Sequence, residues 1–274
     1  MDIKKNLQSF YNAEAKKYAS TRKKHRTDAD IVLEEIKKCW KKTISILEFG
    51  CGSGRLLEHL KTLKWIKIKY TGVDISNELL KIAKKENSDQ HKRSNATSLS
   101  CTFVNDDIAN YVKTLKQESF DFIIGIASFQ HVSTRKERIS LMKNFYRLLS
   151  YEGKLIMTNR ALSLRFLQKH KIQILRSLLE YLISLGKRST RDIMVPRSSQ
   201  TNSKSSVLGA HHSPLKIFRF YHMFGLAELK KLADMSGFAI EKLTYLNQDG
   251  KEILSRAQAS NSFLVAKKDV FTIS

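Results

Sequence analysis

Cysteine is scarce in this chain: three cysteines, at positions 39, 51 and 101, stand among 274 residues. Their number is odd, and no two of them have the CxxC spacing of a metal or redox motif. The chain therefore offers neither a disulfide framework nor a zinc site, and we expect no bound metal. Unpaired thiols persist where the surroundings are reducing, so we expect a cytoplasmic protein.

Long apolar runs are also absent. The first ten residues, MDIKKNLQSF, lack the apolar region of a signal peptide, and no stretch of about eighteen uncharged apolar residues occurs in the sequence. These absences predict a soluble protein that is not exported and has no membrane partner.

Acidic residues are few relative to basic ones, 26 against 49, which gives a formal net charge of +23. Such an excess favours a polyanionic partner, with RNA or DNA ahead of an anionic membrane surface. The lysines are spread along the entire chain, so a general enrichment of solvated faces in lysine is the alternative explanation.

What the sequence does contain is organised around residues 44–57, which read ISILEFGCGSGRLL. An apolar run ends at Glu48, glycines follow at positions 50, 52 and 54, and an apolar helical pattern then resumes. This order predicts a buried strand, a tight turn and the start of a helix. Glycine permits positive φ and close approach of a ligand, and the helix start offers unpaired N–H groups. We expect a ligand-binding loop here.

The glycine spacing narrows the choice of ligand. A dinucleotide-binding loop has the spacing GxGxxG, and Arg55 stands where its third glycine would be. The pattern here is GxGxG, with Glu48 two residues before the first glycine. Twenty residues after Gly54, Asp74 ends a second apolar run, where an acid reaches a ribose in βαβ units of this kind. A bound nucleoside is therefore predicted.

The first part of the chain alternates helices and strands, as an α/β domain does. The predicted helices are 1–43, 54–64, 76–85 and 134–150, the last opened by a Thr134–Glu137 capping box, and the predicted strands are 67–74, 101–108, 119–129 and 153–160. The polar stretch 86–100 is expected to be a surface loop. Ligands of such sheets bind at the carboxyl ends of the strands, so 126–135 and 158–161 should face the same crevice as the glycine loop.

The second part departs from simple alternation. Residues 161–186 predict one long helix or two shorter ones packed over the sheet, with a membrane-surface helix as the alternative. Residues 187–213 are rich in Ser, Lys and Arg and predict a flexible basic loop suited to phosphates. A helix that ends near Gly237 and two final strands, expected as a hairpin at one edge, complete the chain.

The motifs EFGCGSG and GVDIS resemble those of the class I S-adenosylmethionine-dependent methyltransferases. The resemblance implies an α/β fold with a Rossmann-like, seven-stranded, mostly parallel sheet, a helical insertion and a terminal strand pair. It implies one domain over 1–274: an N-terminal helical lid (1–43), a cofactor-binding core (44–160), the insertion with the basic loop (161–214) and the C-terminal part of the sheet (215–274).

The same resemblance assigns the cofactor contacts. The glycine loop would wrap the amino-acid end of S-adenosylmethionine, Asp74 would accept the ribose hydroxyls, and Asp107 with Ile108 would hold the adenine. An N-cap role for Asp107 is the alternative. The full set of predicted cofactor-binding residues is Tyr18, Arg22, Glu48, Gly50, Gly52, Gly54, Asp74, Ile75, Asp107, Ile108 and Ala127.

Motifs outside the core resemble one family, the eukaryotic-type tRNA methyltransferases that esterify a carboxymethyl group on the wobble uridine. They are FYNAEAKKYASTR near the N-terminus, FQHVSTRKERI after the fourth strand, DIMVP at 192–196 and RFYH at 219–222. The chain departs from the family at Gln130, where the family has His, and at Arg197, where it has Trp. The resemblance implies tRNA as a partner and a small zinc-containing activator subunit as another.

A carboxylate acceptor is already ionised at pH 7, so methyl transfer to it needs no general base. It needs alignment, and cations that hold the carboxylate through paired donors. The predicted catalytic residues are His131, Arg22 and Arg135, and the predicted substrate-binding residues are Gln130, Arg160, Arg219, Tyr221 and His222. A helix-entry role for His131 is the alternative. At the level of function, a small-molecule methyltransferase and a non-catalytic RNA-binding or partner-activating module remain open beside the tRNA enzyme.

Overall fold

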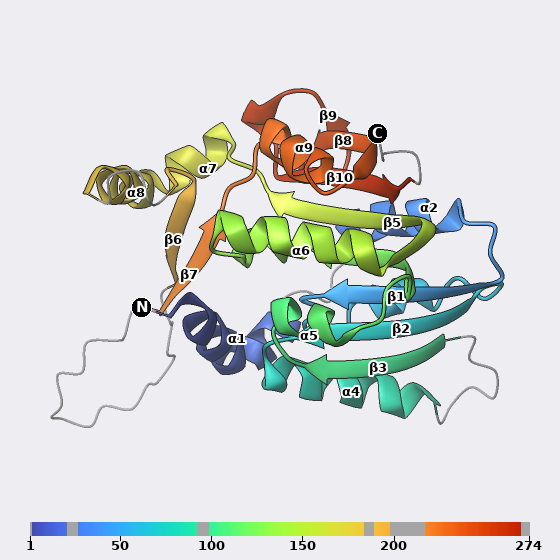
Figure 1. Cartoon of the computed structure of the whole chain (residues 1–274). Coiled ribbons are helices and arrows are strands. Elements are labelled where there is room, and N and C mark those ends of the chain that lie inside the picture. Colours follow the sequence, from blue (N-terminus) through green and yellow to red (C-terminus); the bar gives the residue numbers. More distant parts are fainter. Residues whose placement is uncertain (1, 21–26, 92–98, 184–188, 198–216, 270–274) are drawn as a thin grey trace, which may run out of the picture.

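A mostly parallel sheet of eight strands forms the centre of the protein, in the order β3-β2-β1-β4-β5-β10-β8-β9 (Figure 1). The computed structural model describes residues 2–20, 27–91, 99–183, 189–197 and 217–269. The strands of the sheet are β1 (Thr43–Phe49), β2 (Lys67–Asp74), β3 (Leu99–Asn105), β4 (Phe120–Ile126), β5 (Leu149–Arg160), β8 (Phe238–Leu246), β9 (Glu252–Ile253) and β10 (Asn261–Lys268). The predicted fold class is confirmed, and the eighth strand is the two-residue β9.

The first five strands are parallel, whereas β10 is antiparallel to both β5 and β8. The predicted terminal strand pair is therefore present. It does not sit wholly at an edge, because β10 lies between β5 and β8 and only β8 with β9 lies outside it.

Helices cover both faces of the sheet, and each face has its own apolar core. The helices are α1 (Ile3–Ser20), α2 (Thr27–Lys37), α3 (Leu56–Leu60), α4 (Asn77–His91), α5 (Ile108–Thr114), α6 (Arg135–Leu148), α7 (Leu164–Lys169), α8 (Lys171–Ile183) and α9 (Leu226–Asp234). Strand β1 serves both cores, with Ile44 and Ile46 in one and Leu47 and Phe49 in the other. This is the behaviour of a central strand buried on both faces.

Two predicted helix starts are confirmed by their caps. The Ser76 hydroxyl accepts a hydrogen bond from the Leu79 N–H at 3.2 Å, and the Thr134 hydroxyl accepts one from the Glu137 N–H at 3.2 Å. In a capping box the Glu137 carboxylate would also accept a hydrogen bond from the Thr134 N–H. Here that carboxylate forms an ion pair with Lys4 instead. Helix α4 continues to His91, so the predicted loop 86–100 begins later than expected, and its residues 92–98 lie outside the described residues.

The prediction that the 161–186 insertion packs over the sheet is wrong. Helices α7 and α8 extend from one end of the molecule beside β6 and β7, because both faces of the sheet are already covered (Figure 1). Ser177 on α8 is buried and donates a hydrogen bond to the Asp192 carbonyl at 2.7 Å. The apolar side of the helix consequently faces outward, with Ile172, Leu175 and Leu182 60 to 67% exposed.

Part of the predicted basic loop is a strand. Residues Asp192–Arg197 form β6, which pairs antiparallel with β7 (Ile217–His222) as a separate two-stranded sheet. Ile193 and Val195 on β6 pack with Tyr221, an alternation that the surrounding charged residues concealed. Residues 198–216 of that loop lie outside the described residues. No helix in the described part of the chain is long and apolar enough to cross a membrane.

Candidate functional site

A cavity lies at the carboxyl ends of β1, β2 and β4, and helix α1 lies across it. The Gln8 amide on α1 donates to the Ile75 carbonyl at 3.0 Å, and the Asn12 side chain accepts from the Ser76 hydroxyl at 2.8 Å. These bonds fasten the N-terminal helix over the strand ends. The lining comprises Lys4, Leu7, Tyr11, Tyr18, Phe49, Gly50, Gly52, Val73, Asp74, Ile75, Leu79, Asp106, Asp107, Ile108, Ala127, Ser128, His131, Val132, Glu137 and Leu141.

The glycine loop forms one wall of the cavity, and its geometry requires glycine. Gly50 has φ of 66°, and a Cβ there would lie 2.3 Å from the Ser128 hydroxyl oxygen. At Gly52, with φ of 56°, a Cβ would meet Leu79 and Tyr18 at 3.9 Å. Since Gly52, Leu79 and Tyr18 all line the cavity, a ligand could approach the main chain closely at this position.

Asp74 is the most constrained acid in the cavity wall. One carboxylate oxygen accepts from the Gly52 N–H at 2.8 Å and the other from the Ser76 N–H at 2.8 Å. Burial raises the pKa of Asp74 to about 6, and the two hydrogen bonds oppose part of that rise. Each oxygen keeps a further lone pair, so the carboxylate can accept hydroxyl donors from a ribose.

Asp107 acts as the N-cap of α5, the alternative role that the sequence left open. One oxygen accepts from the Ala109 N–H at 2.8 Å, and the other pairs with Lys4 at 2.5 Å. Lys4 also pairs with Glu137, so it links the start of α1 to two elements of the cavity. Sequence reasoning missed Lys4, because a single lysine in a lysine-rich N-terminus carries no distinguishing signal. Asp107 still lines the cavity, so the cap leaves an adenine contact open to it.

His131 lies in the cavity wall with both ring nitrogens engaged. Nδ1 lies 2.8 Å from the Phe220 carbonyl oxygen, and Nε2 lies 3.0 Å from the Tyr11 hydroxyl oxygen. A carbonyl only accepts, so Nδ1 carries a proton, and in the neutral ring Nε2 accepts from Tyr11. The Tyr221 ring lies 5.0 Å from the imidazole. Sequence reasoning missed Tyr11 as a site residue, although it stands in the aromatic N-terminal motif.

Arg219 lies behind Tyr11 and His131 in a largely aromatic surrounding. Its guanidinium lies 4.9 Å from the Phe10 ring centre and 5.3 Å from the Tyr221 ring centre. It also forms a side-chain hydrogen bond with Tyr11, and its Nε is buried without a hydrogen-bond partner. Among the described residues no carboxylate pairs with this guanidinium. A positive charge is therefore held next to the cavity wall, with no neutralising acid among the residues that the structure describes.

Some of the residues predicted to contact the cofactor line the cavity, and others do not. Glu48 accepts a hydrogen bond of 2.5 Å from the Tyr70 hydroxyl and does not line the cavity. Gly54 has φ of 74° and packs against Ala83 of α4, again away from the lining. Tyr18, Ile75, Ile108 and Ala127 all line the cavity. Arg22 lies outside the described residues.

The predicted substrate residues separate into two groups. Tyr221 and Arg219 surround His131 and Tyr11, whereas Gln130 is buried and accepts from the Arg160 N–H at 2.6 Å. The Arg160 side chain is exposed at the end of β5. Gln130 thus fixes the backbone beside the cavity and does not line it.

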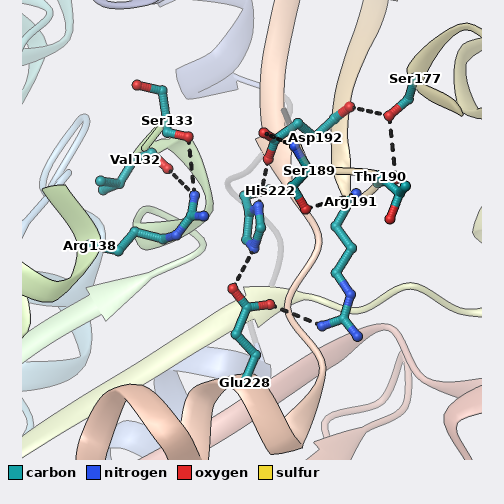
Figure 2. A network of polar contacts seen from close by, with 10 residues as sticks. All are labelled: Val132, Ser133, Arg138, Ser177, Ser189, Thr190, Arg191, Asp192, His222 and Glu228. Atoms are coloured by element: carbon teal, nitrogen blue, oxygen red, sulfur yellow. Dashed lines mark hydrogen bonds and ion pairs between the residues drawn. The ribbon is translucent and has the colours of Figure 1, made fainter. Parts of the chain in front are cut away.

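His222 belongs to a different polar network, which connects the hairpin to the body of the protein (Figure 2). Its Nδ1 lies 2.6 Å from Asp192 and its Nε2 lies 2.8 Å from Glu228, which also pairs with Arg191 at 2.9 Å. Burial opposes ionisation of Glu228, yet its hydrogen bond with His222 and the nearby Arg138 and Arg191 lower its pKa below the ordinary value. The network joins β6, β7 and α9.

Residues 47–157 match the model of the methyltransferase domain. This range holds the glycine loop, Asp74, Asp107 and His131. Residues 47–157 therefore form a methyltransferase domain within this fold. S-adenosylmethionine is accordingly the cofactor, and the open glycine backbone and the oriented Asp74 carboxylate fit its nucleoside.

Known proteins resemble the chain in sequence or in structure. It is 29% identical over 154 residues to the malonyl-[acyl-carrier protein] O-methyltransferase of Bacillus cereus; the match covers 56% of this chain and 51% of that protein, so the chain spans about half the length of this relative. A solved S-adenosylmethionine-dependent methyltransferase of Methanosarcina mazei is 20% identical with a TM-score of 0.60, over 86% of this chain and 97% of that one. A Haloferax volcanii methyltransferase, solved in complex with the Trm112 methyltransferase activator, is 11% identical with a TM-score of 0.58, over 98% of this chain and 100% of the matched chain. At such identities the two structures show the fold alone.

Proposed function

We propose that this chain transfers the methyl group of S-adenosylmethionine to a carboxylate oxygen, and that the acceptor is a carboxymethylated wobble uridine in tRNA. The observation that carries the proposal is the part-buried Arg219 charge beside the cavity. Among the described residues it has aromatic and hydroxyl neighbours and no carboxylate partner. An acceptor carboxylate would supply the missing negative charge.

Different residues of the cavity would hold different parts of the cofactor. S-adenosylmethionine, when bound, supplies a methyl group on a positively charged sulfur. Gly50 and Gly52 would let the main chain approach the amino-acid end, Asp74 would accept the ribose hydroxyls, and Asp107 with Ile108 would hold the adenine.

On the acceptor side, no proton has to be removed, because a carboxylate is ionised at neutral pH. Arg219 would attract the carboxylate, and Tyr11 and His131 would orient it by hydrogen bonds once Tyr11 exchanges its present partner. The net charge of +23 suits the polyanionic tRNA that carries such an acceptor.

A carrier-bound malonyl group is the second candidate acceptor. It is favoured by the 29% identity with the Bacillus cereus O-methyltransferase, whose name gives a malonyl acceptor. The free end of a malonyl group is also a carboxylate, so either acceptor would require the cavity to hold and align a carboxylate. A small activator subunit is part of the proposal, since the fold is shared with a methyltransferase that binds one.

Transfer of a labelled methyl group from S-adenosylmethionine tests the proposal. Total tRNA with free carboxymethyluridine and malonyl-carrier protein are offered separately, with and without an activator subunit. Label in an esterified uridine supports the first acceptor, and label on the malonyl group alone replaces it by the second. Asp74→Ala should abolish transfer to either, whereas Asp234→Ala, which removes an exposed carboxylate on α9, is the matched control and should not. Transfer to neither acceptor refutes the proposal.

A further inference from the structure

Both tryptophans of the chain are exposed, and each stands just before a strand of the central sheet. Trp40 is 83% exposed and precedes β1, and Trp65 is 62% exposed and precedes β2. Among the residues that the structure describes, neither indole contacts another aromatic ring or a cation. Tryptophan is highly buried on average, so the exposure of both is a signal of binding.

The two tryptophans lie at the same end of the sheet, because their strands are adjacent and parallel. The Lys67 N–H donates to the Lys42 carbonyl at 2.8 Å, and Thr43 is in register with Lys67. Each tryptophan stands two residues before one of these lysines. The two Trp-x-Lys segments therefore enter the sheet side by side, at the amino ends of β1 and β2 (Figure 1).

Lysines flank both indoles. Segments 37–43 and 61–69 contain no acidic residue, and their lysines stand at positions 37, 38, 41, 42, 61, 64, 67 and 69. Acids of neighbouring elements pair with some of them: Glu34 with Lys37, Glu35 with Lys38, Asp121 with Lys41 and Glu58 with Lys61. The other lysines are exposed and have no ion pair within the described part of the chain; they are Lys42, Lys64, Lys67 and Lys69. Positive charge without a described counter-charge thus remains beside the two rings.

The composition of this surface distinguishes between the polyanions that could bind it. A segment that enters a membrane surface presents leucine or phenylalanine together with tryptophan. Here the aliphatic residues of the two segments, Leu63, Ile66 and Ile68, are buried in the core. The surface offers flat aromatic faces and cations, without an aliphatic side chain to insert. Aromatic faces and cations are the groups that hold single-stranded nucleic acids, through base stacking and phosphate contacts.

We propose that this tryptophan–lysine surface, made of Trp40, Trp65, Lys42, Lys64, Lys67 and Lys69, binds a single-stranded stretch of RNA. Bases would stack on the two indoles, and the lysines would lie against the neighbouring phosphates. The surface is separate from the cofactor cavity, because that cavity lies at the carboxyl ends of the same strands, about 25 Å away at the rise per residue of a strand. The choice of RNA rather than DNA rests on the proposed tRNA acceptor.

Tryptophan fluorescence tests the surface directly, because the chain has no tryptophan elsewhere. An oligouridine of about 15 nucleotides is added to the whole chain at low salt, and stacking on the indoles should quench the emission until the site is saturated. Oligothymidine of the same length and vesicles of phosphatidylserine with phosphatidylcholine are added in separate titrations.

Variants show which groups are responsible, with affinity measured by the anisotropy of a labelled oligouridine. Trp40→Leu and Trp65→Leu keep an apolar side chain but no aromatic face, so each should weaken binding about 5- to 150-fold, the worth of one stacked base. Trp40→Phe retains a ring and should keep most of the affinity.

The lysines are tested by the salt dependence of the same binding. Lys67→Ala should make the slope of log affinity against log salt shallower by about 0.7. Lys143→Ala is the matched control, because it removes the same charge from an exposed position on α6, outside this surface, and its slope should equal that of the wild type. S-adenosylhomocysteine should bind equally to all of these proteins, which verifies that each is folded.

Unchanged fluorescence with oligouridine overturns the proposal, as does full affinity in both leucine variants or an equal change of slope in Lys143→Ala. Quenching by the vesicles alone would identify a membrane as the partner, and quenching by oligothymidine alone would identify DNA; either result overturns the assignment to RNA. The proposed function fails separately. Oligouridine binding that depends on the tryptophans, without methyl transfer to tRNA, would refute the function and leave the surface. Methyl transfer to tRNA without quenching by oligouridine would refute the surface alone.

Discussion

Asp74 should make cofactor binding depend on pH. Its pKa of about 6 lies close to the physiological range, because burial disfavours the charged carboxylate. Ribose hydroxyls donate to the ionised form, so protonation removes acceptors from the site. At pH 5 about one carboxylate in ten is ionised, and the apparent affinity for S-adenosylhomocysteine should therefore be about tenfold weaker than at pH 7.5.

Isothermal titration calorimetry with S-adenosylhomocysteine measures this dependence. At pH 6 binding should release about half a proton, which is visible as a difference in heat between buffers of unlike ionisation enthalpy. Asp74→Asn cannot titrate, and it should lose about 10- to 100-fold in affinity at pH 7.5, the worth of one charge-assisted hydrogen bond. Asp234→Asn on the surface of α9 is the control and should behave as the wild type.

Asp74 should also make the free energy of unfolding depend on pH. The pKa of Asp74 is raised on folding, from 3.8 to about 6, so its contribution favours the folded state below pH 4 and is lost as the pH rises through 6. The shift of about two units corresponds to about 3 kcal/mol. A pH-independent affinity, or the same tenfold fall in Asp74→Asn, would refute the assignment.

Three further changes test other parts of the site. His222→Ala leaves Asp192 and Glu228 facing each other without their shared donor, so the free energy of unfolding should fall by about 3 kcal/mol in urea titrations; an unchanged midpoint would contradict the network. Tyr11→Phe removes the hydroxyl between Arg219 and His131, and methyl transfer should fall about tenfold while calorimetry shows unchanged S-adenosylhomocysteine affinity; a parallel loss of affinity would assign Tyr11 to the cofactor instead. Gly50→Ala places a Cβ against Ser128, so cofactor affinity should fall at least tenfold, and Ser128→Gly should restore part of it; no rescue would mean that the positive φ alone is responsible.

The sequence determined those features whose cause is local. Three glycines at alternate positions permit the three positive φ values of the loop, and no other residue type adopts them as cheaply. The apolar runs predicted the central strands, and Ser76 and Thr134 marked helix starts because a cap is made within three residues. Asp74 followed from its place at the end of β2, next to the loop in any βαβ unit.

The tertiary structure decided which distant side chains meet. Lys4 and Tyr11 reach Asp107 and His131 because α1 packs across the strand ends, and no spacing within α1 encodes that contact. Arg135 was predicted to be catalytic and His222 to bind the substrate, yet α6 and the β6–β7 hairpin place both in the lining of a cavity other than the one that holds the glycine loop. An apolar helical period likewise predicted that α8 exists but not which side it turns inward, since that depends on the surface available to it. The conformation of the glycine loop thus follows from its own residues, whereas packing between distant segments decides which side chains lie beside His131 and Asp107.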